Sequence, residues 1–173
     1  MGRVYVSIGS NLQPEVHIPS ALAELRRRYG ALIVSPVYES EAVGFEGDNF
    51  YNLVVGFDTD DDVHAVARAL REIEHRHQRR RDGKRFGPRT LDLDLLLYDD
   101  LVLDGEGVAI PRHDILRYAF VLKPLADIAG ERRHPVDGRT YAELWAALAR
   151  AGTGGLLWPV ELPVAEVSEC IAN

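Results

Sequence analysis

The chain has 173 residues, of which 27% are charged and 46% are hydrophobic, and its net charge is −7. This length suits one compact domain. No run approaches the ~20 consecutive apolar residues of a membrane span, and the first residues alternate instead of forming the long apolar segment of a signal peptide. We therefore expect a cytoplasmic protein without a membrane partner. The single cysteine, Cys170, excludes an internal disulfide or a cysteine-based zinc site.

The charges are unevenly distributed along the chain. Residues 75–89 read HRHQRRRDGKRFGPR, whereas 58–62 and 92–104 are acidic. A protein that binds nucleic acid mainly through charge is usually basic overall, so the net charge disfavours that class. A basic segment beside an acidic one would suit an anionic substrate carried by a divalent cation, but a solvated surface with local ion pairs would show the same composition.

Hydrophobic periodicity predicts alternating strands and helices in the first hundred residues. In chain order, we expect a strand (3–8), a turn (9–11), a helix (16–29), a strand interrupted by Pro36 (31–38), a loop (42–48), a strand (49–57), a helix capped by acidic residues (63–77), a charged loop (78–90) and a strand (91–98). A loop as long as the last one is usually functional in a compact domain.

The remaining residues predict shorter elements. We expect a hairpin through 99–105, a helical turn from Pro111, an apolar segment over 120–128, a helix over 141–149 and an irregular tail over 151–173. The order β-α-β-β-α-β indicates an α+β fold, a ferredoxin-like sandwich of an antiparallel sheet with helices plus C-terminal additions. Residues 1–150 would form the domain, and the tail would belong to it.

Asp92 and Asp94 form the most informative pair in the sequence. Residues i and i+2 of a strand project to the same face, so the two carboxylates lie together while Leu91, Leu93 and Leu95 face the other way. Two neighbouring carboxylates repel each other unless a cation lies between them. Mg²⁺ is commonly held by one or two carboxylates plus substrate phosphates. Salt bridges to nearby arginines on a solvated face are the alternative.

The segment before this strand is rich in arginine. Guanidinium groups pair bidentately with phosphate oxygens, and phosphoryl transfer depends mainly on electrostatic stabilisation. The sequence lacks a P-loop, because Gln78 stands where its first glycine would be. The arginine-rich segment therefore indicates a phosphate-binding site that is not a P-loop.

Residues 87–97, GPRTLDLDLLL, closely resemble the signature of the 6-hydroxymethyl-7,8-dihydropterin pyrophosphokinase family of folate synthesis. Three further blocks agree in order, namely SIGSNL (7–12), DNFYN (48–52) and AFVLKPL (119–125). The resemblance extends over about residues 4–148. It implies transfer of pyrophosphate from ATP to the hydroxymethyl group of the pterin, with release of AMP, by an enzyme that uses ATP as co-substrate and two Mg²⁺ ions.

The resemblance also implies roles for individual residues. Asp92 and Asp94 would hold the metal ions, and they would act in catalysis together with Arg79 and Arg89. The pterin would contact Ser40, Val43, Gly44, Phe50, Asn52 and Phe120, with its ring between the two phenylalanines. ATP would contact Glu74, Arg79, Arg81, Phe86, Arg89, Arg112 and His113.

The chain departs from the family pattern at three places. Phe86 replaces the usual tryptophan before Gly-Pro-Arg, Arg112 precedes His113 where histidine usually follows proline, and Tyr118 stands at a position that is commonly arginine. These changes leave open a transferase that acts on a modified pterin. A ferredoxin-like RNA-binding module is a further alternative, which the acidic net charge disfavours. We expect a monomer with small-molecule substrates and no nucleic-acid partner.

Overall fold

The computed structural model describes residues 1–41, 49–78 and 91–162. Its strands are β1 (Gly2–Ser10), β2 (Ile33–Val34), β3 (Val37–Ser40), β4 (Phe50–Thr59), β5 (Asp92–Tyr98), β6 (Leu103–Gly105), β7 (Val108–Ile110) and β8 (Leu157–Val160). Its helices are α1 (Pro14–Tyr29), α2 (Val63–Gln78), the 3-10 helix η1 (His113–Leu116), α3 (Ala119–Ala129) and α4 (Tyr141–Ala151). None of the helices in these ranges is both long and apolar enough to cross a membrane.

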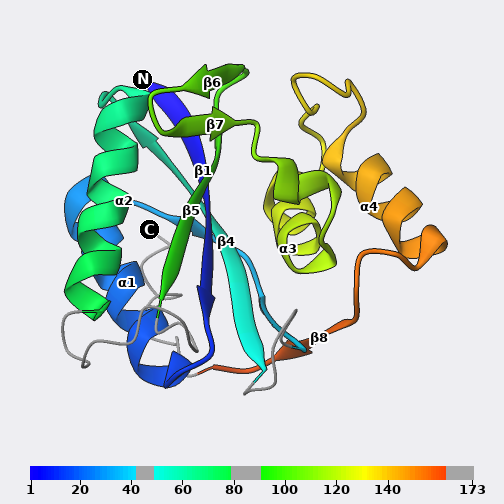
Figure 1. The fold of residues 1–173 in the computed structure, drawn as a ribbon, viewed down its shortest axis with the longest axis horizontal. Coiled ribbons are helices and arrows are strands. Elements are labelled where there is room, and N and C mark those ends of the chain that lie inside the picture. Colours follow the sequence, from blue (N-terminus) through cyan, green and yellow to red (C-terminus); the bar gives the residue numbers. More distant parts are fainter. Residues whose placement is uncertain (42–48, 79–90, 163–173) are drawn as a thin grey trace.

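The main sheet is antiparallel, with the strand order β5–β1–β4–β3–β8, and β2 also pairs with β4. The two central strands, β1 and β4, pair over the whole length of β1, from Gly2 opposite Thr59 to Ser10 opposite Tyr51. This arrangement confirms the predicted ferredoxin-like α+β fold. The hairpin β6–β7 forms a second, two-stranded sheet beside the edge strand β5 (Figure 1).

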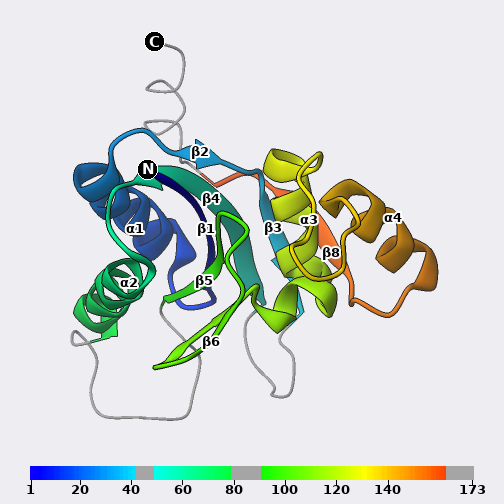
Figure 2. The same ribbon diagram turned by 90° about the horizontal axis from the view of Figure 1, so that it is seen from above.

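Helices cover both faces of the sheet (Figure 2). On one face, α1 and α2 pack against apolar side chains of β1, β4 and β5, and the hairpin residues Val108 and Ile110 join the same core. On the other face, α3 packs with α4 against a smaller core that includes Tyr5 and Val54. The functional side chains described below come from this second face, from the β5 edge and from α2 beside that edge.

The helix ends have local causes. Asp62 Oδ1 accepts a hydrogen bond from the backbone N–H of Ala65 at 2.8 Å and so caps α2. Thr140 and Glu143 form a reciprocal capping box at the start of α4. The sequence had predicted the acidic cap of α2 from the run of aspartates before it.

Three local predictions are wrong. The hairpin predicted through 99–105 lies later in the chain, since its strands are β6 and β7 at 103–105 and 108–110. The predicted turn over 9–11 begins too early, because Gly9 and Ser10 still belong to β1, where they pair with Asn52 and Tyr51. The segment 157–160, predicted to be irregular, forms β8 and pairs with β3. Its proline weakened the strand signal, and proline is tolerated in edge strands such as this one.

Candidate active site

The predicted division of side chains on β5 is confirmed. Leu91, Leu93 and Leu95 are buried in the core beneath α1 and α2. Asp92 and Asp94 alternate with these leucines and therefore project from the opposite face, where both are partly exposed. The pairing of β1 with β5 shifts after Leu95, so this alternation holds for the first part of the strand. Two carboxylates thus stand together at the edge of the sheet.

A row of paired residues connects Asp92 with Asn52. Gly9 of β1 lies opposite Asp92 on one side and opposite Asn52 on the other. A Cβ added at Gly9 would lie 2.9 Å from Asn52 Oδ1 and 4.0 Å from the Cβ of Asp92. Because Gly9 has no side chain, the carboxamide of Asn52 lies against the Gly9 backbone, and we call this interruption in the row of side chains, which the amide oxygen partly fills, the notch. Adjacent strands lie about 4.8 Å apart, and β1 separates the strands of Asp92 and Asn52. The two residues therefore lie on either side of Gly9, two strand spacings from each other.

The polar side chains beyond this notch are buried. Asn52 is 5% exposed and Ser40 is 4% exposed. The Nδ2 of Asn52 donates to the Oγ of Ser40 over 3.4 Å. Phe50 lies two residues before Asn52 on β4 and therefore on the same face of the sheet. Three of the predicted pterin contacts, Ser40, Phe50 and Asn52, thus lie together.

Phe120 approaches from the helix that covers this face. It lies in the first turn of α3 and is partly buried against the smaller core. Its ring stacks on that of Tyr118, with 5.0 Å between the centroids and 19° between the planes. Farther along α3, Asp127 accepts a hydrogen bond from the hydroxyl of Tyr38, and this contact fixes the helix to β3.

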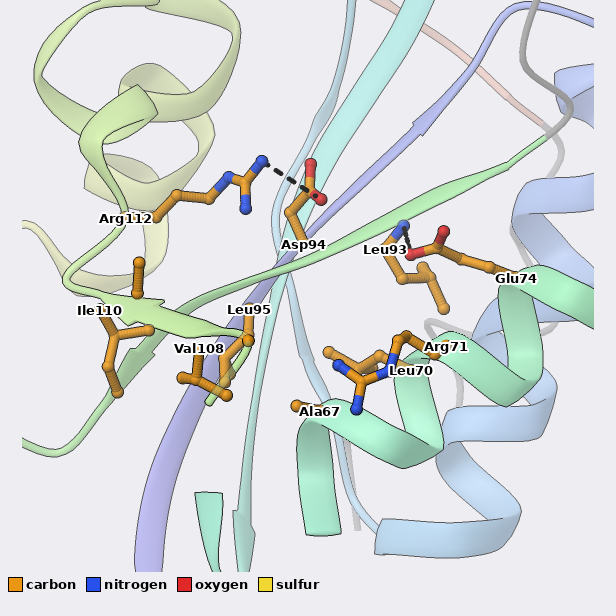
Figure 3. Close-up of a pocket in the computed structure, with 12 residues that line it drawn as sticks. Ala67, Leu70, Arg71, Glu74, Leu93, Asp94, Leu95, Val108, Ile110 and Arg112 are labelled. Atoms are coloured by element: carbon orange, nitrogen blue, oxygen red, sulfur yellow. Dashed lines mark hydrogen bonds and ion pairs between the residues drawn. The ribbon is translucent and has the colours of Figure 1, made fainter. Parts of the chain in front are cut away.

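Among the residues that the structure describes, Arg112 is a cation that contacts Asp94. Its Nη2 lies 3.5 Å from Asp94 Oδ1 (Figure 3), and its Nε donates to Asp114 Oδ2 over 2.9 Å. Burial lowers the pKa of Arg112, but the carboxylates of Asp94, Asp114 and Asp92 outweigh it, so the pKa is raised overall. The neighbouring His113 is exposed. Of these two adjacent residues, both predicted to contact ATP, Arg112 contacts Asp94.

A cavity of about 160 Å³ adjoins Asp94. Its walls come from α2, β5 and the hairpin strand β7, and Arg71 and Arg112 approach it from opposite sides (Figure 3). Apolar side chains form much of its lining, namely Ala67, Leu70, Leu93, Leu95, Val108 and Ile110. A lining that combines apolar side chains with two cations and carboxylates suits a flat heterocycle that carries phosphates.

Glu74 connects the cavity with β5. Its Oε1 accepts a hydrogen bond from the backbone N–H of Leu93 at 3.1 Å, which satisfies a donor on the open edge of the strand. Glu74 also lines the cavity, as does Arg71 one turn earlier on α2. The sequence prediction named Glu74 but missed Arg71. Their spacing of three residues on one helix face was the available signal.

Several predicted site residues lie outside the described residues. They are Val43 and Gly44, predicted for the pterin, and Arg79, Arg81, Phe86 and Arg89, predicted for ATP and catalysis. Of the others, Arg112 contacts Asp94 and Glu74 contacts the backbone of β5 beside the pair, whereas Ser40, Phe50 and Asn52 lie together on β3 and β4. The sequence prediction also missed the notch at Gly9. The neighbours of Gly9 are set by the register between strands that are distant in the sequence, which local patterns do not give.

The donor set at Asp92 and Asp94 suits Mg²⁺. Both ligands are carboxylates, the oxygen donors that this ion prefers, and both are partly exposed, so phosphates and water can complete the coordination. Within residues 1–41, 49–78 and 91–162, no group of three or more histidine, cysteine or acidic side chains could hold a metal ion by itself. The two carboxylates therefore fit an ion that shares its coordination with a phosphorylated substrate.

Comparison with known families agrees with this geometry. The model of the 7,8-dihydro-6-hydroxymethylpterin-pyrophosphokinase family matches residues 5–130. A 2-amino-4-hydroxy-6-hydroxymethyldihydropteridine pyrophosphokinase from Pseudomonas aeruginosa is 42% identical over 149 residues, which are 84% of this chain and 91% of that protein. The protein of the same name from Bacillus subtilis is 33% identical over 128 residues, covering 72% of this chain and 76% of that protein.

Other relatives are much longer than this chain. The folic acid synthesis protein fol1 of Pneumocystis carinii is 34% identical over 142 residues, but these make up only 19% of its length. Among solved structures, an HPPK-DHPS of Plasmodium falciparum has the same fold, with a TM-score of 0.70 and 14% sequence identity over 86% of this chain and 43% of that one. The family match and the similarity to the Pseudomonas protein show that this chain belongs to the 7,8-dihydro-6-hydroxymethylpterin-pyrophosphokinase family.

Proposed function

We propose that this protein transfers the pyrophosphoryl group of ATP to the hydroxymethyl oxygen of 6-hydroxymethyl-7,8-dihydropterin and releases AMP, a step of folate synthesis. The observation that carries this proposal is the position of the Asp92–Asp94 pair. It lies between the cavity beside α2 and the notch at Gly9. Two substrates bound in these two places would meet at the carboxylates. Family membership supports the same reaction.

The base of ATP would occupy the cavity. The apolar side chains of α2, β5 and β7 offer a surface for the base, and Arg112 lies beside Asp94, where the phosphates would pass. We propose that Glu74, Arg71 and the exposed His113 also contact the nucleotide. From the resemblance, we add Arg79, Arg81, Phe86 and Arg89 as contacts of the nucleotide and its transferring group.

The pterin would lie over the notch. Gly9 lets the Asn52 amide lie close to the backbone of β1, Asn52 and Ser40 offer hydrogen-bonding groups for the edge of the ring, and Phe50 and Phe120 would stack on its two faces. Burial of the amide and the hydroxyl makes their hydrogen bonds selective, because a ligand without matching groups would leave them unsatisfied. Val43 and Gly44 complete the proposed set from the resemblance.

The chemistry requires positioning and charge stabilisation. Asp92 and Asp94 would hold two Mg²⁺ ions, which when bound neutralise the charge of the triphosphate. The hydroxymethyl oxygen attacks the β-phosphorus in line, the bond from that phosphorus to the α,β-bridging oxygen breaks, and AMP leaves with the bond's electron pair. The hydroxyl proton passes to solvent. Arg112, Arg79 and Arg89 stabilise the charge that develops on the phosphate oxygens.

The nucleotide product tests this proposal. The protein is incubated with ATP, Mg²⁺ and 6-hydroxymethyl-7,8-dihydropterin, and the products are separated by chromatography. We expect AMP and pterin pyrophosphate in equal amounts. Formation of ADP would indicate simple phosphoryl transfer, and no pterin-dependent turnover would exclude the reaction. Salt-sensitive retention of RNA in the absence of ATP turnover would support the RNA-binding alternative instead.

We further propose that the protein acts as a cytoplasmic monomer. The proposed site is built from elements of one chain, which supports a monomer without requiring it. Light scattering at assay concentration measures the mass, and fractionation of the source cells measures the compartment. A stable dimer, or recovery with a membrane or secreted fraction, would contradict this part of the proposal.

A further inference from the structure

Tyr118 is held rigidly at the start of α3. It is the N-cap residue of the helix, and its carbonyl oxygen accepts hydrogen bonds from the N–H groups of Val121 and Leu122 at 3.1 and 3.0 Å. Its own N–H donates to the carbonyl of Asp114 over 3.0 Å. The side chain is partly buried against the smaller core, and the guanidinium of Arg117 lies 5.6 Å from the ring centroid. Both the backbone and the ring of Tyr118 are therefore fixed.

Phe120 takes its orientation from this fixed ring. Their centroids are 5.0 Å apart and their planes differ by 19°, an offset stack of the kind that aromatic pairs favour. An aromatic ring has two faces. With Tyr118 on one face of Phe120, a bound heterocycle would stack on the other. A ring that is already oriented loses less rotamer freedom when a ligand binds, and this raises affinity.

We infer that Tyr118 is a positioning residue that acts through Phe120 and fixes that ring in the orientation required for pterin binding. The inference rests on the proposed function, because only that function places Phe120 against the pterin. Tyr118 occupies a position that is commonly arginine in the family. In this chain, the position thus contributes to aromatic preorganisation instead of supplying a charge.

The test separates pterin affinity from turnover. The KM for hydroxymethyldihydropterin, the KM for ATP and kcat are measured for Tyr118→Leu and Tyr118→Phe, with Tyr29→Leu as the matched control. Tyr29 stacks on Phe57 in the core on the other face, at 4.2 Å and 13°. From the strength of aromatic pairs, we expect Tyr118→Leu to raise the pterin KM by about two- to tenfold, with the KM for ATP and kcat within about twofold of the wild type. Tyr118→Phe and Tyr29→Leu should retain the wild-type pterin KM.

A double-mutant cycle with Phe120→Leu shows whether Tyr118 acts through Phe120. Once Phe120 is replaced, Tyr118→Leu should have no further effect on the pterin KM. Three results would overturn the inference. The pterin KM could rise equally in Tyr118→Phe and Tyr118→Leu, or only the KM for ATP could change. The effects of Tyr118→Leu and Phe120→Leu on the pterin KM could also add up in the cycle. A wild-type pterin KM in folded Tyr118→Leu, with Phe120→Leu impaired, would overturn this inference alone. An unaffected Phe120→Leu would overturn the pterin site as well.

Discussion

Arg112 and Asp94 form an ion pair at the edge of the cavity, with Nη2 and Oδ1 3.5 Å apart. The same guanidinium donates to Asp114 through Nε, so Arg112 is held by two carboxylates from different parts of the chain. Asp94 is 38% exposed on its side chain, and so ions and phosphates can reach it. In the free protein Arg112 compensates the carboxylate pair, and in the proposed complex it would turn toward phosphate oxygens.

Replacing Arg112 should weaken nucleotide binding. A hydrogen bond to a charged group contributes about 1.5–3 kcal/mol, so we expect Arg112→Ala to raise the KM for ATP by roughly tenfold or more. Arg112→Lys should recover only part of this loss, because lysine cannot bridge two oxygens as a guanidinium does. Steady-state kinetics with varied ATP measures the effect. Arg150→Ala, an exposed change on α4, is the control. An unchanged KM for ATP in Arg112→Ala would remove Arg112 from the site.

The carboxylate pair should be essential for turnover and dispensable for folding. We expect Asp92→Asn and Asp94→Asn each to reduce kcat by roughly 10²-fold or more, as for other groups that stabilise developing charge. Both side chains are partly exposed, and an exposed ion pair contributes about 0–1 kcal/mol, so the free energy of unfolding without Mg²⁺ should change by no more than about 1 kcal/mol.

Kinetics and urea unfolding of the same samples test both parts of this prediction. Asp104→Asn, on the exposed strand β6, controls for the loss of one negative charge. Near wild-type turnover in either variant, at ordinary Mg²⁺ concentrations, would contradict the metal assignment.

The sequence predicted what depends on local pattern. The alternation of leucine and aspartate on β5 was sufficient to assign a face to each side chain, and the structure confirms that assignment. Salt bridges from arginines to the Asp pair were an alternative in the sequence, but Arg112 was not predicted to be the partner of Asp94, because no local pattern determines how the chain returns after the β6–β7 hairpin. The notch at Gly9 depends on the register between β1 and β4, which long-range pairing sets. These features follow from packing rather than from periodicity.

Gly9 should be required because of the close approach of Asn52. In Gly9→Ala the new methyl group would lie 2.9 Å from Asn52 Oδ1, closer than such contacts are normally tolerated, so the amide must move. We expect the pterin KM to rise several-fold, by roughly the cost of one lost or bent hydrogen bond, about 1 kcal/mol, while the KM for ATP stays unchanged. Gly105→Ala is a matched control, since a methyl group there would meet nothing within 4 Å. Equal kinetics in Gly9→Ala and Gly105→Ala would show that the pterin does not use this notch.

His134 should make the protein less stable in mild acid. It is 4% exposed, and its Nδ1 accepts hydrogen bonds from the N–H groups of Val136 and Asp137 at 3.1 and 3.0 Å. Burial lowers the pKa of His134, against a smaller opposing effect of Asp137. In the unfolded chain the pKa of a histidine is about 6.5. Between that pH and the lower folded-state pKa, the unfolded chain therefore binds a proton at His134 that the folded protein does not. This contribution to stability is fully present above that pH and decreases as the pH falls from about 6.5 toward the lowered folded-state pKa.

Urea unfolding at pH 7.5 and at pH 5.5 measures this effect. Asparagine at position 134 can present an acceptor oxygen near the place of Nδ1 but does not titrate, so His134→Asn should lose less stability than the wild type between the two pH values. His75→Asn, which replaces an exposed histidine on α2, should keep the wild-type difference. The comparison isolates one histidine from the other titrating groups, because each variant is measured against itself at the two pH values. If His134→Asn and the wild type lost equal free energy of unfolding over this range, the acid sensitivity would have to arise elsewhere in the chain.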